Sequence, residues 1–180
     1  MSIDGLLQLD MRATQALRVK ESSGLGWHLA TGLAHSGDSW LWLAFLVAVL
    51  LLAVPPWREA ALILAIGIVA LALFVFVLKK VIGRARPDGE WGAFYRLTDP
   101  HSFPSGHAAR GFMIAVFSLA LGVPWLSALL WLWATALGLS RVATGLHYLS
   151  DTLGGILLGV LAGWILIQLS PWLIGLWSFL

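Results

Sequence analysis

The stretch Ser140-Arg-Val-Ala-Thr-Gly-Leu-His147-Tyr-Leu-Ser-Asp151 places an arginine, a histidine and an aspartate between two strongly apolar segments. Ionisable side chains at or near membrane depth are costly, so such a cluster indicates a functional role. His147 and Asp151 are four residues apart, and on a helical turn they would share one face. The carboxylate could then hold the proton of one imidazole nitrogen while the other nitrogen acts as a nucleophile. An ordinary surface pair has the same spacing, so the rest of the chain must decide between the two interpretations.

The composition is that of an integral membrane protein. Hydrophobic residues make up 59% of the 180 residues and charged residues only 11%, whereas soluble domains are about half apolar and a quarter charged. The net charge of +2 gives no reason to expect nucleic-acid binding, and the absence of cysteine excludes disulfides and thiolate metal sites. Asp4 and Asp10 interrupt the N-terminal segment, so no signal peptide is predicted.

Hydrophobic periodicity predicts a single all-α membrane domain over residues 1–180. Residues 3–20 have the pattern of an amphipathic helix that lies at the membrane interface. About five apolar transmembrane segments follow, and a sixth would arise if the Gly-rich residues 24–38 cross the bilayer by themselves. The five are residues 40–54, with a start inside the preceding Gly-rich region, and residues 60–78, 105–121, 125–142 and 151–169. The glycines of the last segment recur about every four residues, which favours close helix packing, within the chain or in a dimer.

The order of these segments brings three polar stretches to one membrane surface. The second segment ends at Lys79, and the third begins near Ser105 on the same side. The fourth returns to that side near Arg141, and the fifth leaves from Asp151. The long polar connection over residues 79–104 lies there too, and a long loop in a compact bundle is usually functional.

The residues gathered at that surface suit a tetrahedral oxyanion. Lys79, Arg86 and Arg141 supply positive charge, and arginine forks match phosphate oxygens in pairs. The segment Phe103-Pro104-Ser105-Gly106-His107 opens a helix, whose first N–H groups attract anions, and Gly106 permits close approach. Of the two histidines, His107 and His147, one could attack phosphorus while the other protonates the leaving oxygen.

Three motifs in order resemble the signature of the type 2 phosphatidic acid phosphatase (PAP2) superfamily. They are Lys79-(six residues)-Arg86-Pro87, Pro104-Ser105-Gly106-His107 and Ser140-Arg141-(five residues)-His147-(three residues)-Asp151. The resemblance implies a metal-independent phosphatase without a cofactor, which works through a phosphohistidine intermediate. It implies that His147 is the nucleophile, that Asp151 orients it and that His107 is the general acid. The phosphate-binding residues implied in the same way are Lys79, Arg86, Ser105, Gly106 and Arg141.

The resemblance also implies a lipid phosphate substrate: an isoprenyl diphosphate, phosphatidylglycerophosphate or phosphatidic acid. The sequence does not choose among them, nor does it predict an oligomeric state. The implied location is the inner membrane of a bacterium, with the site at the periplasmic face. The positive-inside rule points the other way, because Arg12, Arg18 and Lys20 share the catalytic side unless residues 24–38 cross.

Two other functions are weighed against a lipid phosphatase. A vanadate-dependent haloperoxidase resembles it in the anion site, but such enzymes are large soluble proteins, and five apolar segments argue against one. A transporter or channel predicts charges within the spans and no paired histidines, whereas here the charges gather at one surface.

Three further residues lie outside the motifs. Arg110 follows His107 by three residues and could bind a second phosphate or a head group, although an ion pair with Asp88, Glu90 or Asp99 is the simpler expectation. His28 and His35 are seven residues apart and share a helical face; we interpret them as interfacial histidines rather than a metal pair.

Overall fold

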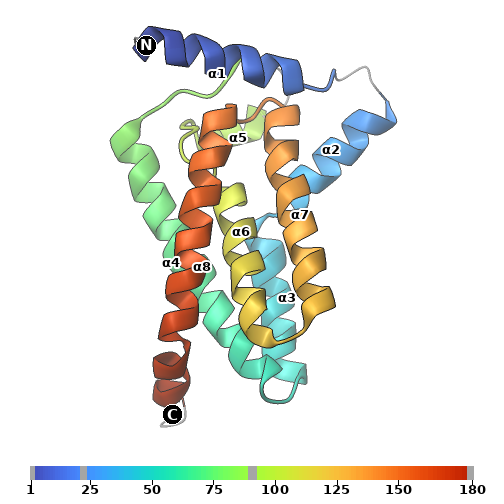
Figure 1. The fold of residues 1–180 in the computed structure, drawn as a ribbon, viewed down its shortest axis with the longest axis vertical. Helices are drawn as coiled ribbons and strands as arrows, with labels where there is room; N and C mark the ends of the chain where they lie inside the picture. The colour runs from blue at the N-terminus through green and yellow to red at the C-terminus, as the bar shows by residue number, and fades with distance from the viewer. Residues whose placement is uncertain (1–2, 21–23, 89–92, 178–180) are drawn as a thin grey trace.

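The computed structural model describes residues 3–20, 24–88 and 93–177, and these ranges form an all-α fold. The chain folds into a bundle of helices with one helix, α1, lying across its end (Figure 1). The helices are α1 (Ile3–Leu17), α2 (Leu25–Ser36), α3 (Ser39–Leu52), α4 (Trp57–Ile82), α5 (Ala93–Thr98), α6 (Gly106–Ser118), the 3-10 turn η2 (Leu119–Leu121), α7 (Pro124–Ala143) and α8 (Leu149–Trp177). The prediction of an all-α fold is therefore confirmed.

The predicted number of membrane spans is only partly supported. Within the described residues, three helices are long and apolar enough to cross a bilayer: α4, α7 and the 149–175 part of α8. A fourth candidate is the pair α2 and α3, which qualify together but are bent by 56° at the break between them. The predicted third span contains a 13-residue helix, α6, followed by a single 3-10 turn, so it is shorter than the other candidates. The structure thus gives three to four candidate spans.

The boundaries of α4 show how local sequence signals set these helices. Pro55 and Pro56 precede the helix, and the negative charge of Glu59 in the first turn interacts favourably with the positive end of the helix dipole. At the other end, Gly83 adopts φ 64°, a left-handed conformation that glycine reaches without strain. Lys79 lies in the last turn, four residues before that stop. The helix end therefore delivers this lysine to the polar end of the bundle.

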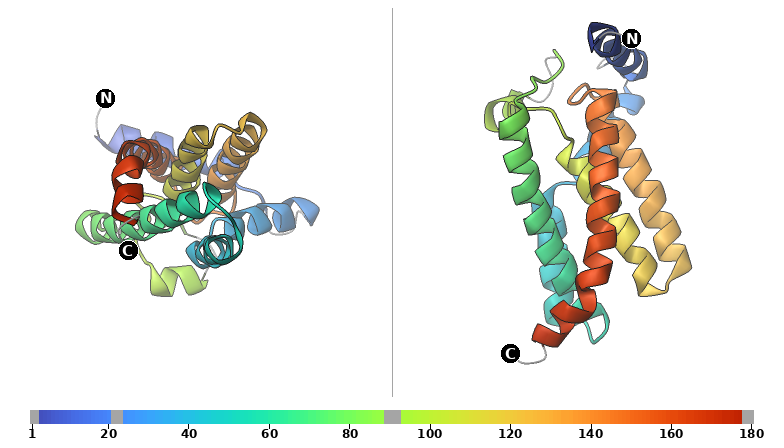
Figure 2. Two further views of the ribbon diagram at one scale, coloured as in Figure 1. Left: turned by 90° about the horizontal axis from the view of Figure 1, so that it is seen from below. Right: turned by 60° about the vertical axis from the view of Figure 1, so that its left-hand side comes forward.

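Helix α6 is the centre of the bundle, and α8 packs closely along it (Figure 2). Every residue of α6 from Ala108 to Ser118 is buried. A Cβ atom added at Gly155 would lie 2.4 Å from the Ser105 carbonyl oxygen, and one added at Gly159 would lie 2.2 Å from that of Ala109. The glycine series of α8 therefore serves packing within the chain, where α6 and α8 approach backbone to backbone.

Helix α1 docks on the beginning of α8. The backbone N–H of Leu149 donates to Thr14 Oγ1 at 3.0 Å, and that of Ser150 donates to Asp10 Oδ1 at 2.9 Å. Helix α1 therefore lies at the same end as the third motif, and the candidate span that follows it is the bent pair of α2 and α3 (Figure 1). Helix α2 is not a candidate span by itself and qualifies only together with α3.

Candidate active site

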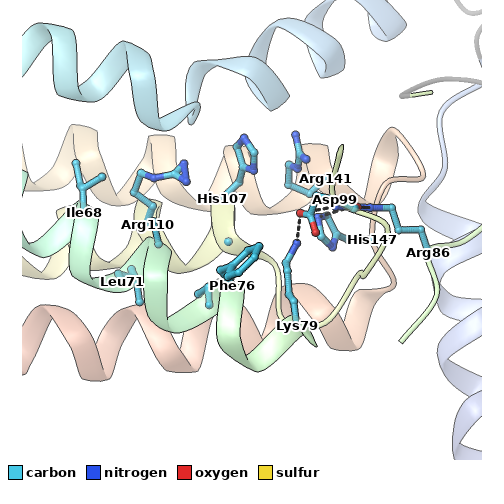
Figure 3. A pocket seen from close by; sticks show the side chains of 13 residues that line it. Ile68, Leu71, Phe76, Lys79, Arg86, Asp99, His107, Arg110, Arg141 and His147 are labelled. Carbon is cyan, nitrogen blue, oxygen red and sulfur yellow. Dashed lines mark hydrogen bonds and ion pairs between the residues drawn. The ribbon is translucent and has the colours of Figure 1, made fainter. Parts of the chain in front are cut away.

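A cavity of about 300 Å³ opens between the polar end of the bundle and the middle of α4 (Figure 3). Its polar half is lined by side chains from all three sequence motifs, and its apolar half is lined by one face of α4. The polar lining residues are Lys79, Arg86, Asp99, Gly106, His107, Arg110, Arg141 and His147; the apolar ones are Ile68, Leu71, Ala72, Val75 and Phe76. The structure therefore brings most of the predicted site residues around one cavity, and the remaining two, Ser105 and Asp151, lie buried beside it.

His147 and Asp151 form a buried pair. The distance from His147 Nδ1 to Asp151 Oδ2 is 3.7 Å, and both side chains are almost completely buried. The expected helical turn does not join them, because His147 precedes α8, whose first residue is Leu149. Asp151 Oδ2 instead accepts a hydrogen bond from the Tyr148 N–H at 2.8 Å, which fixes the carboxylate at the beginning of the helix. The other imidazole nitrogen, Nε2, is 3.2 Å from Arg86 Nη1.

The surroundings of His147 favour its neutral form. Burial lowers the pKa of the imidazole well below its usual range, and the positive charges of Arg141, Arg86 and Lys79 lower this pKa further. A neutral imidazole keeps the lone pair that a nucleophile needs. At neutral pH the residue is thus in the protonation state that nucleophilic attack requires.

Arg84 is a site residue that the sequence reasoning missed. Its guanidinium donates to Asp151 Oδ1 and to Asp10 Oδ2, each at 2.7 Å, and it lies 4.2 Å from the centre of the Tyr148 ring. Burial would raise the pKa of Asp10, but hydrogen bonds from Ser150 and Arg84 outweigh it and lower that pKa. The ion pair therefore connects α1 to the carboxylate beside His147. Its position between Lys79 and Arg86 in the first motif was the available signal.

Asp99 is a second residue that the sequence reasoning did not place in the site. Its carboxylate forms an ion pair with Lys79 and accepts a hydrogen bond from Arg86 Nη2 at 2.9 Å (Figure 3). Lys79 Nζ also donates to the His101 carbonyl at 3.1 Å. Two of the predicted phosphate ligands thus hold one carboxylate, whose side chain is 40% exposed. A phosphoryl group that bound these cations would take the position of that carboxylate.

The end of α2 and the break that follows it contact three other cationic or titratable side chains. Arg141 Nη1 donates to the Ala34 carbonyl at 3.1 Å, and Arg110 Nη1 donates to the Gly37 carbonyl. His107 Nε2 lies 2.7 Å from Asp38 Oδ1. Arg110, for which a carboxylate of the polar loop was expected, therefore has a backbone acceptor in the break. Of the expected partners, Glu90 lies outside the described residues.

The second motif opens α6 as predicted. Ser105 is the N-cap residue, and its hydroxyl accepts the Ala108 N–H at 3.5 Å. A Cβ atom added at Gly106 would meet only Val75 Cγ1, at 3.4 Å. The first N–H groups of the helix therefore lie beside the cavity, where they could contact an anion.

The described residues contain no group of three or more His, Asp or Glu side chains arranged to hold a metal ion. His28 Nδ1 bonds to the Gly24 carbonyl oxygen at 2.8 Å, whereas His35 Nδ1 lies 3.2 Å from Asp38 Oδ2. The two histidines thus have different partners, and His35 belongs to the surroundings of His107.

The fold and the site together define a membrane protein of the PAP2 superfamily, and the chain belongs to that superfamily: the family model described as "PAP2 superfamily" matches residues 59–174. The chain is 33% identical to a decaprenylphosphoryl-5-phosphoribose phosphatase of Mycobacterium tuberculosis over 139 residues, which cover 74% of this chain and 75% of that protein. It is also 33% identical to the lipid A 1-phosphatase of Porphyromonas gingivalis over 120 residues, 65% of this chain. The chain spans only 24% of that protein and 43% of the lipid A 4'-phosphatase of Bacteroides thetaiotaomicron.

Two solved structures share the fold. The PAP2-type phosphatidylglycerolphosphate phosphatase of Bacillus subtilis superposes with a TM-score of 0.75 at 25% identity, over 93% of this chain and 87% of that one. LpxE of Aquifex aeolicus superposes with a TM-score of 0.71 at 25% identity, over 89% of this chain and 95% of that one.

Proposed function

We propose that this chain is a metal-independent phosphatase that removes a phosphoryl group from a membrane lipid through a phosphohistidine intermediate. The observation that carries the proposal is the position of His147, a buried imidazole whose pKa is lowered by burial and that lies among Lys79, Arg86 and Arg141. Such a site offers both a nucleophile and the charge that stabilises a phosphoryl group in the transition state. The lipid phosphatases among the relatives support the same reaction class.

The proposed reaction has two displacement steps at phosphorus. In the first, His147 Nε2 attacks, the bond to the leaving oxygen breaks, and His107 gives its proton to that oxygen. In the second, a water molecule attacks the phosphohistidine, His107 takes the proton of the water, and the bond from phosphorus to nitrogen breaks. The phosphoryl oxygens are held by Lys79, Arg86, Arg141 and the N-terminal residues Ser105 and Gly106.

The shape of the cavity supports a lipid substrate. Its apolar half, formed by Leu71, Val75 and Phe76 of α4, begins directly beside the polar half and could receive a hydrocarbon chain. The substrates we propose are an isoprenyl diphosphate, phosphatidylglycerophosphate or phosphatidic acid. Arg110 also lines the cavity and would contact the second phosphate of a diphosphate. The apolar helices α4 and α8 argue against a soluble haloperoxidase.

We further propose that the single domain crosses the inner membrane of a bacterium five times, with α6 as the shortest crossing, and that the cavity faces the periplasm. Helix α1 would then lie along the outer surface, where Arg18 donates to the Asp88 carbonyl at 2.9 Å. Single cysteines at Asp88 and at Arg58, near opposite ends of the bundle, test this orientation with an impermeant thiol reagent. Labelling of the Arg58 position alone in intact cells would reverse the proposed orientation.

Variants of the two histidines test the proposed chemistry. His147→Ala should abolish both turnover and the phosphoenzyme. His107→Ala should slow hydrolysis of an alkyl lipid phosphate by about 10²–10⁴-fold, the usual contribution of a general acid. It should retain far more activity on an aryl phosphate, whose leaving group needs little protonation. Asp151→Asn should fall between the two variants on the lipid phosphate, because the imidazole loses its charged neighbour but keeps its place.

The measurement is trapping of radiolabelled enzyme from a labelled lipid phosphate with a mildly alkaline quench, under which phosphohistidine survives. Label that persists in His147→Ala and disappears in His107→Ala would reverse the two roles. Labelling that neither substitution changes would show that the histidines are structural, and the proposed reaction would fail. A panel of lipid mono- and diphosphates assayed for phosphate release in detergent would then identify the preferred substrate.

A further inference from the structure

Asp38 occupies an unusual position in the break between α2 and α3. It is the N-cap residue of α3, where an aspartate normally accepts a hydrogen bond from the first turn of the helix, yet its side chain forms no such cap. The carboxylate instead lies between two histidines. Asp38 Oδ1 is 2.7 Å from His107 Nε2, and Asp38 Oδ2 is 3.2 Å from His35 Nδ1. The Asp38 carboxylate thus contacts a residue 69 positions away in the sequence and does not cap its own helix.

The backbone of the break is fitted to this contact. A Cβ atom added at Gly37 would lie 2.6 Å from Leu137 Cδ2 and 3.3 Å from His107 Cδ2. The break therefore packs closely against Leu137 of α7 and His107 of α6. The side chains of Asp38 and His107 are mostly buried, at 15% and 14% exposure, so water screens their interaction weakly.

The charges around His107 make this carboxylate important for a proton donor. Arg110 of α6 and Arg141 of α7 lie near the imidazole, while Lys79 of α4 and Arg86 of the polar loop line the same cavity; His147 is a further titratable neighbour. The positive charges of Arg110 and Arg141 disfavour a second proton on His107. The carboxylate of Asp99 contacts Lys79 and Arg86. The carboxylate of Asp38 contacts His107 itself.

We propose that Asp38 is the positioning residue of the general acid, holding the Nε2–H of His107 and stabilising its protonated form; this role rests on the proposed phosphatase reaction. In the first step the proton on Nδ1 goes to the leaving oxygen as the bond from phosphorus to that oxygen breaks. His107 is then neutral and keeps its Nε2 proton on Asp38. In the second step Nδ1 takes the proton of the attacking water. The site thus contains two histidine–carboxylate pairs, His147 with Asp151 and His107 with Asp38.

The test compares two substrates on the same variant. Asp38→Asn keeps the shape of the side chain but removes its charge. Because Asp38 acts on the leaving-group proton, the ratio of kcat/KM for an alkyl lipid phosphate to that for an aryl phosphate should fall by about 10–100-fold, part of what a general acid contributes. The ratio does not depend on the fraction of active protein. Glu59→Gln, the same change of carboxylate to amide at the other end of the bundle, should leave it unchanged.

The pH profile of kcat/KM is a second readout, and it would not change if Asp38 only held the helices together. For the alkyl substrate the alkaline limb should shift to lower pH in Asp38→Asn, because an amide no longer favours the protonated imidazole. Asp38→Glu, which keeps the charge, should recover part of the lost ratio.

Any one of three results would overturn the inference. They are an unchanged substrate ratio in Asp38→Asn, an unmoved alkaline limb, and complete loss of activity on the aryl phosphate in both Asp38 variants. Failure of the proposed function would look different, since the wild-type protein would then release no phosphate from any lipid and would form no phosphoenzyme.

Discussion

Gly155→Ala should disturb the active site through the backbone. The added Cβ atom would lie 2.4 Å from the Ser105 carbonyl oxygen, and ordinary contact of such atoms begins near 3.4 Å. Relieving the clash therefore requires α8 and the start of α6 to separate by several tenths of an ångström, up to about 1 Å. Ser105 begins the helix that carries His107, and its N–H donates to the Asp151 carbonyl at 3.0 Å. The substitution therefore displaces the second motif relative to the third.

A misplacement of about 1 Å can cost about 10²-fold in rate, so we expect kcat/KM to fall by about 10–100-fold on alkyl and aryl substrates alike. Gly32→Ala is the matched control, because Gly32 is also helical and its Cβ atom would meet nothing within 4 Å. Both substitutions gain about 1 kcal/mol of helix propensity. Overpacking at Gly155 should therefore appear as a difference of about 1–3 kcal/mol between the two variants.

Denaturant unfolding in detergent measures the free energy of unfolding, and phosphate release measures the rate. Gly159→Ala adds a second comparison, because Gly159 lies one turn further along α8 from His147 and its Cβ atom would lie 2.2 Å from the Ala109 carbonyl oxygen. We expect a similar loss of stability there with a smaller loss of activity. Wild-type stability and activity in Gly155→Ala would show that α8 repacks freely, and the close approach of the two helices would then not position the site.

Four further predictions concern the site itself. Activity should persist in EDTA, because three cationic side chains meet the phosphate charge; loss in chelator that one divalent ion restores would contradict the mechanism. Arg141→Lys should lose most activity in the phosphate-release assay, since a lysine cannot make a two-pronged contact, and near-normal turnover would remove Arg141 from the phosphate ligands. Arg110→Ala should slow diphosphate hydrolysis more than monophosphate hydrolysis; equal losses would place Arg110 in the core of the site. His147 should stay neutral as the pH falls through 6.5, because burial and nearby cations lower its pKa. Below about pH 6.5 the unfolded chain binds a proton at this residue that the folded state does not bind. The free energy of unfolding should therefore fall as the pH falls below about 6.5. Histidine ring NMR, assigned with His147→Asn, checks this, and a titration midpoint near 6.5 would contradict it.

The sequence predicts the parts of the fold that depend on local pattern. Long apolar runs and their boundary signals located α4, α7 and the start of α8 to within a few residues, because Pro and Gly residues bound these helices. The predicted end of α8 near residue 169 was wrong, since the helix continues through Pro171 to Trp177. The α2–α3 pair was harder to assign. Its bend lies at Gly37 and Asp38, where the chain packs against Leu137 of α7 and His107 of α6, and no local pattern in the sequence records such a contact.

The same distinction separates the site residues that were predicted from those that were missed. Asp151 was found because it lies four residues after His147, within reach of a motif. Asp38 lies 69 residues before His107, and Asp10 lies 74 residues before Arg84, so their roles depend on tertiary structure. Asp99 lies in a polar loop, where a carboxylate is common and does not indicate a particular role. The sequence thus predicts the histidines and most of the cations of the site, though not Arg84. The carboxylates Asp10, Asp38 and Asp99, which contact several of these side chains, lie outside the three motifs.

Those carboxylates affect how tightly a phosphoryl group can bind. Lys79 and Arg86 contact Asp99, so a phosphate that binds these cations must displace a carboxylate. Its binding free energy is therefore the difference between the free energy of its own ionic contacts and that of the contacts with Asp99. Asp99 is 40% exposed and can return to water at little cost. Asp151, which is fully buried and held by Arg84, cannot leave in this way. We therefore assign the two carboxylates different parts in the reaction: Asp151 stays to hold the loop of His147, whereas Asp99 yields its place to the substrate.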